Sequence, residues 1–315
     1  MYFSINTSYK LGMIISASRR TDIPCYYSEW FIQRLKAGYV LARNPMNYSQ
    51  VSYISLSKDV VDCIVFWTKD AENITDKLQE IDKLGFKYCF QYTITPYDSD
   101  IEHNLRDKKE IIKNFQLISS KIGKKCMIWR YDPIIVNDKY TIEYHIKAFD
   151  KMCGELSLYA NKVIISFVDI YKKIDSSDIH EIDDATIKEL SKEFGLIAKN
   201  NHIKIQTCSE HYDLFEYGIQ KGGCIDINTI ENVCGYGLKI SGDKGQRKKC
   251  QCVESIDIGM YNTCLNDCVY CYANGNKETV RRNYMSHNPQ AEFLLGESRA
   301  TDKINIRNQK SNKHG

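Results

Sequence analysis

The sequence predicts an α/β protein: a partial, six-unit parallel β/α barrel with a cysteine-rich, metal-binding cap at its C-terminal end. Two patterns predict the barrel, because short apolar runs alternate with amphipathic stretches at helical spacing and polar residues follow the runs. Parallel strands joined by helices have both properties, since binding groups gather at the carboxyl ends of such strands. A third pattern predicts the cap, as glycine and cysteine become frequent beyond about residue 215.

Six apolar runs have the length and composition of strands buried on both faces. They span residues 13–17, 60–67, 88–94, 126–129, 163–168 and 203–208. Apolar residues at helical spacing predict connecting helices, for example over 111–122 and 187–197, and Asp107 with Glu110 predicts the start of the first of these. Six units are fewer than the eight of a complete barrel, so the sheet is expected to be open or only partly closed.

The chain divides into four parts on this plan. We expect an N-terminal extension over 1–12, the barrel-like domain over 13–215, an iron–sulfur cap over 216–290 and a disordered tail over 291–315. The cap cannot bury a large core by itself, so a metal or the neighbouring domain must stabilise it. The tail is polar and has no apolar periodicity, which is typical of disorder.

Charged residues follow several of the predicted strands and are candidates for catalysis: Arg19, Asp22, Lys69, Arg130, Asp132 and Glu210. Because the carboxyl ends of parallel strands share one edge, these residues would line one mouth, where a substrate of unknown identity would bind. The acidic groups would hold amines or hydroxyls, and the arginines an anionic group. The alternative is structural: Asp22 caps a helix, and Arg130 pairs with Asp132 across a turn.

Charge and hydropathy limit the partners of the protein. With 43 Lys+Arg against 40 Asp+Glu, the formal charge is +3, which does not favour nucleic-acid binding. No apolar run reaches the roughly 18 residues of a membrane span, and the first residues lack the basic segment of a secretory signal. We therefore expect a cytoplasmic protein, in which the 13 cysteines favour metal binding over disulfides wherever they cluster.

The strongest local pattern is the spacing of Cys264, Cys268 and Cys271. Three thiolates on one loop can each bind one iron of a 4Fe-4S cluster, and the fourth iron then stays open to another ligand. The rival interpretation is zinc, whose ligands commonly come in close pairs. If Cys250 or Cys252 supplied a fourth ligand, the cluster would be closed and suited to electron transfer.

A second metal site is expected from the remaining C-terminal cysteines. Cys250 and Cys252 are separated by one residue, and Cys208, Cys224 and Cys234 lie upstream, which is enough for a second iron–sulfur cluster or a zinc site. The cysteines of the first half lie singly, and small buried thiols are expected there: Cys25, Cys63, Cys89, Cys126 and Cys153.

The segment from Cys264 to Cys271, with Tyr270 just before the third cysteine, resembles the cluster-binding motif of radical S-adenosylmethionine enzymes. Its continuation over 271–274 resembles the version in the spore photoproduct lyase group. The resemblance implies a partial barrel, S-adenosylmethionine bound to the open iron, and cleavage to a 5'-deoxyadenosyl radical with an electron from a donor such as flavodoxin or ferredoxin. In this hypothesis Tyr270 packs beside the adenine or the cluster, the alternative being a core aromatic at the cap interface. Asp22, Asp169 or Glu210 would hold the methionine amino group in place of a Gly-Gly-Glu run.

Two features depart from that motif. The three cysteines follow the sixth predicted strand instead of the first, and no Gly-Gly-Glu run is present to hold the methionine amino group. The second hypothesis is therefore a non-catalytic or electron-transfer protein, in which a closed cluster or zinc attaches the cap to the barrel.

Most of the chain, from about residue 13 to residue 274, also resembles a bacterial family known as a domain of unknown function, number eighteen forty-eight. The residues that carry this resemblance are the C-terminal cysteines and the segments 15–24, 65–69, 129–133 and 166–169. The family implies a C-terminal cysteine cluster and no particular reaction.

Overall fold

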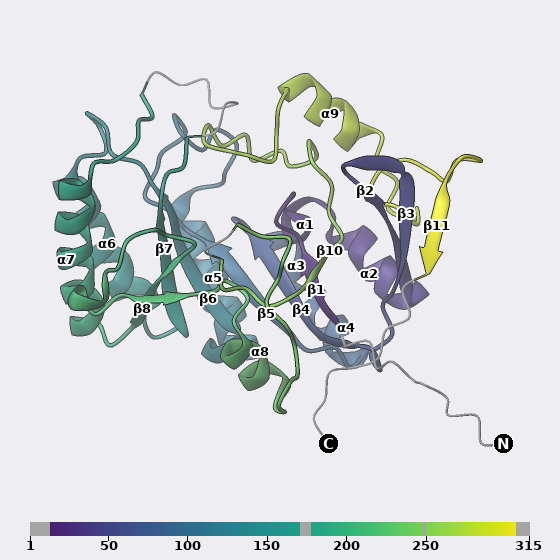
Figure 1. The fold of residues 1–315 in the computed structure, drawn as a ribbon, viewed down its shortest axis with the longest axis horizontal. Helices are drawn as coiled ribbons and strands as arrows, with labels where there is room; N and C mark the ends of the chain where they lie inside the picture. Colours follow the sequence, from purple (N-terminus) through teal and green to yellow (C-terminus); the bar gives the residue numbers. More distant parts are fainter. Residues whose placement is uncertain (1–12, 171–177, 248–249, 307–315) are drawn as a thin grey trace.

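The computed structural model describes residues 13–170, 178–247 and 250–306, and its centre is one eight-stranded sheet (Figure 1). The strand order is β10-β1-β4-β5-β6-β7-β8-β9, and every paired neighbour in it runs parallel. The six predicted strands form its middle in chain order: β1 (Met13–Ala17), β4 (Val61–Thr68), β5 (Tyr88–Thr93), β6 (Met127–Ile134), β7 (Lys162–Phe167) and β8 (Lys204–Cys208). The prediction of a parallel α/β fold is thus confirmed.

Strand β6 is longer than the sequence predicted, because it continues past Trp129 through Arg130 to Ile134. The apolar run ends at Trp129, since the following residues alternate polar and apolar. Its polar residues are already at the carboxyl end of the sheet, where they face the cavity described below.

Side chains of each central strand alternate between two apolar cores, one on each face of the sheet. On one face, residues such as Phe66 and Trp129 pack against the long helices. These are α2 (Ser28–Ala37), α5 (Lys108–Ile122), α6 (Ile142–Leu156) and α7 (Asp184–Asn200), and shorter helices α1 (Ile23–Tyr26), α3 (Glu72–Thr75) and α4 (Leu78–Lys83) join them. On the other face, Val65 and Ile128 pack against α8 (Ile227–Cys234) and the segment around Cys252.

Helix α5 illustrates how the sequence specifies these helices. Asp107 caps its first turn by accepting a hydrogen bond from the Lys109 backbone N–H at 2.8 Å, as predicted from the sequence. Ile111, Phe115 and Ile118 then form its buried stripe against the sheet. None of the described helices is long and apolar enough to cross a membrane.

A second sheet was not predicted. Its strands β2 (Tyr39–Asn44) and β3 (Asn47–Ser55) form a hairpin, and β11 (Lys303–Ile306) pairs with β3, so that the order is β11-β3-β2. Strands β2 and β3 are half exposed and β11 is exposed, and none of the three has the continuous apolar run that indicates a buried strand. Strand β11 lies in the segment 291–315, where disorder was expected; residues 307–315 of that segment lie outside the described residues.

The cysteine-rich segment adds one strand at each edge of the main sheet. Strand β9 (Gln220–Gly222) pairs with β8, and β10 (Ile256–Asp257) pairs with β1. The segment thus extends the sheet, and helix α9 (Lys277–Met285) follows it. The loop with Cys264, Cys268 and Cys271 comes directly after β10, so it lies beside the end of β1 although it follows the sixth predicted strand in sequence.

Candidate functional site

A cavity of about 620 Å³ lies at the carboxyl end of the main sheet. Its lining includes residues 18–22 after β1, 67–69 at β4, Arg130 and Asp132 of β6, 166–169 at β7 and 208–210 at β8. Five of the six predicted loops therefore converge as expected. At the remaining strand, β5, only Thr93 contributes, and Tyr97 is buried behind the wall with its hydroxyl donating to the Pro133 carbonyl at 2.8 Å. The volume suits a ligand of cofactor size.

Cys264, Cys268 and Cys271 line one side of this cavity, and we call them the first thiol group. Their loop is fastened to the segment after β5, because the Val269 backbone N–H donates to the Ile101 carbonyl at 2.9 Å and the Asn104 N–H to the Asn266 carbonyl at 3.2 Å. The Asn266 side chain also donates to Asp22 Oδ2 at 3.2 Å, which joins the loop to the end of β1. These bonds hold the thiols on the cavity without a metal.

Burial dominates the electrostatics of the first thiol group. It raises the pKa of Cys268 to about 12, while the neighbouring Lys69 opposes the rise. The pKa values of Cys264 and Cys271 are raised as well, again chiefly by burial. Neutral thiols are therefore stable there in the absence of a cation, and a bound metal would reverse the balance by favouring the thiolates.

Glu102 organises the charges beside this group and was not predicted from the sequence. Its buried carboxylate accepts hydrogen bonds from Lys69 Nζ at 2.6 Å, from Thr95 Oγ1 at 2.7 Å, and from Lys108 and the Tyr270 hydroxyl. Although burial opposes ionisation, the two lysines lower its pKa to about 2. Lys69 Nζ also lies 5.3 Å from the centre of the Tyr270 ring. Lys69 and Tyr270 are thus placed by one buried carboxylate.

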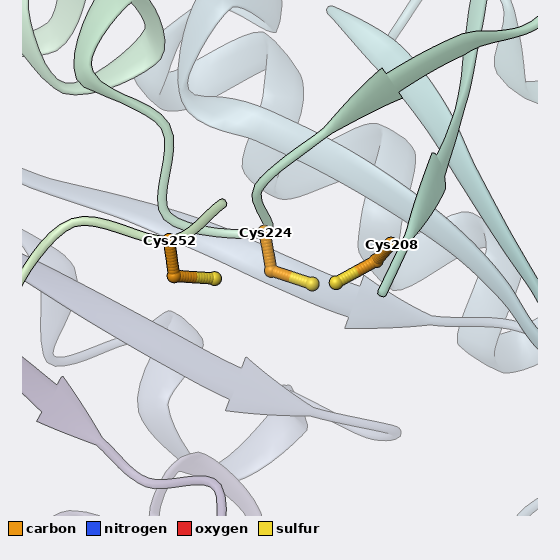
Figure 2. A group of neighbouring side chains, drawn as sticks. All are labelled: Cys208, Cys224 and Cys252. Carbon is orange, nitrogen blue, oxygen red and sulfur yellow. The ribbon is translucent and has the colours of Figure 1, made fainter. Parts of the chain in front are cut away.

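A second thiol group, formed by Cys208, Cys224, Cys250 and Cys252, lines the same cavity. The sulfur atoms of Cys208, Cys224 and Cys252 all lie within 4.8 Å of one another, and Figure 2 shows those of Cys208 and Cys224 pointing toward each other. Cys250 adjoins these thiols, since the Cys252 backbone N–H donates to Cys250 Sγ at 3.5 Å. Cys234, which the sequence offered as another ligand, donates to the Asp62 carbonyl in the apolar core instead.

Two arginines adjoin the second thiol group. Arg130, which is 8% exposed, donates from Nη1 to Cys224 Sγ at 2.8 Å and pairs through Nη2 with Asp132, as the structural alternative expected. The guanidinium carbons of Arg19 and Arg130 lie 4.9 and 5.2 Å from the centre of the Trp67 ring. Asp132 also accepts from the Ser166 hydroxyl. This wall of the cavity therefore combines positive charge with an aromatic surface.

The other predicted acidic residues have different surroundings. Asp22 caps α1 by accepting from the Cys25 backbone N–H at 3.0 Å, which bears out the structural alternative, and burial raises its pKa to about 6. Glu210 accepts from the Phe167 N–H at 2.9 Å, and burial raises its pKa to about 7. Asp169 lies at the rim, 57% exposed in its side chain, and pairs with Arg247.

Several buried polar atoms of the cavity wall make no hydrogen bond to the described residues. The described residues contain seven such side-chain atoms, and five of them belong to residues that line the cavity: Arg19 Nη2, Thr21 Oγ1, Trp67 Nε1, Ser209 Oγ and Asn274 Oδ1. Native proteins rarely leave buried polar atoms without partners. Their concentration on one cavity indicates a place for a polar ligand.

Asp257 is a further residue that the sequence did not reveal. At the end of β10 it accepts hydrogen bonds from Ser18 Oγ at 2.6 Å, the Arg19 N–H at 2.7 Å and the Gly259 N–H at 3.0 Å. A Cβ atom at Gly259 would collide with the Ser18 side chain, so only glycine allows this approach. No local motif marks Asp257, Glu102 or Trp67, since their neighbours come from distant segments.

Comparisons with known proteins identify the family but no activity. The family model described as "Domain of unknown function (DUF1848)" matches residues 14–273. No curated protein matches the chain. Among solved structures, a "putative alpha-L-fucosidase" from Bacteroides thetaiotaomicron is similar over 89% of this chain and 93% of that chain, with 10% sequence identity and a TM-score of 0.28. A TM-score this low does not establish a common fold.

Proposed function

The chain belongs to the DUF1848 family, and we propose that it is an iron–sulfur enzyme of the radical S-adenosylmethionine type. In this proposal the first thiol group holds a 4Fe-4S cluster with one open iron, and the sheet is a partial six-unit barrel around the cavity. Strand β1 and strands β4 to β8 follow one another across the main sheet in chain order, which supports the barrel.

One observation carries the proposal. Cys250 and Cys252, the two thiols that would have closed the cluster, join Cys208 and Cys224 in the second thiol group. The cysteines that perturb the pKa of Cys264 are instead Cys268 and Cys271. Three thiols on one loop, facing a cavity, are the donor set that an open cluster requires.

The residues around the cavity also fit the cofactor. Its volume of about 620 Å³ and its five unpartnered polar atoms suit a ligand with several polar groups. Arg19 Nη2 is placed to bind a carboxylate, and Asn274 Oδ1 to accept from an amine or hydroxyl. Asn274 is also tied to the first thiol group, since its Nδ2 donates to the Cys264 carbonyl at 2.7 Å.

When bound, the cluster would supply the electron that cleaves S-adenosylmethionine to a 5'-deoxyadenosyl radical, and a donor such as flavodoxin or ferredoxin would reduce it. The residues of this chain would bind the cluster, the cofactor and the substrate and hold them in position. Lys69 offsets the negative charge that thiolates bring into a buried site, and Glu102 fixes the position of Lys69. Arg130 and Trp67 would hold the substrate on the far wall, and Glu210 would exchange protons near neutral pH.

The second hypothesis, a metal that only attaches the C-terminal segment to the sheet, is supported by the second thiol group. Its cysteines come from the ends of β8 and β9 and from the segment before β10, so a metal there joins both ends of the cysteine-rich segment to the sheet. The two functions are compatible, because the two thiol groups use different cysteines.

Electron paramagnetic resonance tests the proposal. The protein is reconstituted anaerobically with iron and sulfide and reduced, and spectra are recorded with and without S-adenosylmethionine. We expect the signal to change on addition of the cofactor in wild type, and to be lost in Cys268→Ala. An unchanged signal in wild type would contradict an open iron. Electron transfer or a structural role would then be the remaining functions for the cluster.

A further inference from the structure

Three sulfur atoms of the second thiol group, those of Cys208, Cys224 and Cys252, lie too close together for a large cluster and at the right spacing for one ion. Tetrahedral zinc with Zn–S bonds near 2.3 Å brings its thiolate sulfurs to about 3.8 Å from one another. The sulfurs of Cys208, Cys224 and Cys252 are all within 4.8 Å. Cys250 adjoins these three as a fourth thiol, since the Cys252 backbone N–H donates to Cys250 Sγ at 3.5 Å and the pKa of Cys250 is lowered by the neighbouring thiols of Cys208 and Cys252.

The hydrogen bonds of these sulfurs have the direction expected of metal-bound thiolates. Arg130 Nη1 donates to Cys224 Sγ at 2.8 Å, the Ile225 N–H to Cys252 Sγ at 3.5 Å, and the Cys252 N–H to Cys250 Sγ at 3.5 Å. Such donors stabilise the negative charge on a ligand sulfur. In the apolar core the direction is reversed, since the thiols of Cys63 and Cys234 donate to backbone carbonyls. Those thiols therefore act as hydrogen-bond donors in the apolar core.

The charge around the group balances a divalent ion. Four thiolates and one divalent cation carry a net charge of −2, and two arginines lie beside them. Arg130 interacts electrostatically with Cys224 and Cys208, and Arg19 with Cys252 and Cys224. A buried site with a residual charge of that size requires such compensation.

The backbone is shaped to bring the four cysteines together. A Cβ atom on Gly223 would lie 2.6 Å from the Gln251 carbonyl oxygen, so glycine is needed where the two chain segments meet. The Val253 N–H then donates to the Ile225 carbonyl at 2.9 Å, and Gln91 Nε2 donates to the Cys224 carbonyl at 2.5 Å. Cys224 and Cys252 are therefore held opposite each other by neighbouring backbone.

We propose that Cys208, Cys224, Cys250 and Cys252 bind one zinc ion as a closed four-thiolate site, which forms a wall of the cavity and holds the segment leading to β10 against the sheet. The site is independent of the iron–sulfur proposal, because it shares no ligand with the first thiol group. With four protein ligands it has no open position, so its zinc is structural.

Metal analysis of the protein purified without added iron tests the zinc site. We expect about one zinc per chain in wild type and in Cys268→Ala, and no zinc in Cys208→Ser or Cys252→Ser. Cys89→Ser, a change of a buried core cysteine, is the matched control and should keep its zinc. Retention of zinc in Cys252→Ser, or its absence from wild type, would overturn the proposal.

Cobalt substitution of wild type keeps the test decisive if the serine variants fail to fold. A four-thiolate site gives intense sulfur-to-cobalt charge-transfer absorption and a tetrahedral ligand-field spectrum, and we expect both. An octahedral spectrum without charge-transfer bands would contradict the site. If iron and sulfide remained in Cys268→Ala and disappeared in Cys252→Ser, the second thiol group would hold a cluster in place of zinc. That outcome would overturn the zinc proposal, but it would not decide whether the first thiol group binds a cluster.

Discussion

The two thiol groups on the cavity are built in opposite ways. The first comes from eight consecutive residues of one loop; its cysteines are half-buried, the pKa values of their thiols are raised, and Lys69 lies close to Cys268. The second is collected from the ends of two strands and a distant loop, and the sulfurs of Cys224, Cys250 and Cys252 accept hydrogen bonds from N–H groups. This difference fits our two proposals, in which a cofactor completes the first group and the second group binds a single ion.

The largest effect is expected for the first thiol group itself. Cys268→Ala removes one of only three ligands of the proposed cluster, so the iron bound after reconstitution should fall from about four per chain to background. Cys25→Ala, a partly exposed cysteine outside both groups, is the control and should retain the iron. Iron counting after gel filtration makes the comparison. Equal iron in both variants would place the cluster elsewhere.

The buried carboxylate beside the first group should contribute strongly to stability. Glu102→Gln leaves Lys69 and Lys108 without their ionised partner, and breaking a buried ion pair costs about 3–5 kcal/mol. Urea unfolding of the protein without iron measures this cost. The matched control is Glu72→Gln, whose side chain is 57% exposed and pairs with Arg106, so its cost should stay at about 0–1 kcal/mol. Equal costs would mean that Glu102 does not organise this site.

Release of metal by acid can be compared between the two thiol groups only at pH values at which the sheet stays folded. His145 limits how low that pH can be. Its ring is buried between the Tyr131 hydroxyl and the Ile135 carbonyl, and burial lowers its pKa from 6.5 to about 4. The folded state therefore binds fewer protons than the unfolded state between these pH values. Stability is present above pH 6.5 and is lost as the pH falls toward 4, by up to about 3 kcal/mol.

Thermal unfolding of wild type and His145→Gln from pH 8 to pH 4 tests this expectation. The difference in unfolding free energy between the two proteins should change over that range, whereas His103→Gln, which alters an exposed histidine, should follow wild type. A difference that does not depend on pH would show that His145 does not titrate on unfolding.

The smallest effect is expected beside the second thiol group. Arg130→Lys keeps the charge but loses the guanidinium fork that reaches both Cys224 and Asp132. Loss of an outer partner typically lowers metal affinity about 10–100-fold. Zinc competition with a chromophoric chelator measures the change. Arg247→Lys, at the rim, is the control, and equal affinities in the two variants would remove Arg130 from the site.

The central sheet and the first thiol group were predictable because their signals are local. Apolar runs such as 88–94 are buried on both faces, and the spacing of Cys264, Cys268 and Cys271 lies within one loop. Strands β2 and β3 were missed because they are only partly buried, and β11 because it is exposed throughout. Strands β9 and β10 were missed because two or three residues carry no periodicity.

The second thiol group was predictable only in part. The sequence offered Cys208, Cys224, Cys234, Cys250 and Cys252 without a way to choose among them, since the choice depends on which strands lie side by side. Pairing of β9 with β8 brings Cys224 to Cys208, whereas α8 carries Cys234 into the core. The roles of Glu102 and Asp257 could not be predicted for the same reason, because their hydrogen-bond partners are remote in sequence.

Anomalous diffraction at the iron and zinc edges, from anaerobically grown crystals of the reconstituted protein, tests the central claim most directly, because it locates each metal. The account predicts an iron cluster held by Cys264, Cys268 and Cys271, and zinc among Cys208, Cys224, Cys250 and Cys252. Iron at the second thiol group together with none at the first would contradict it.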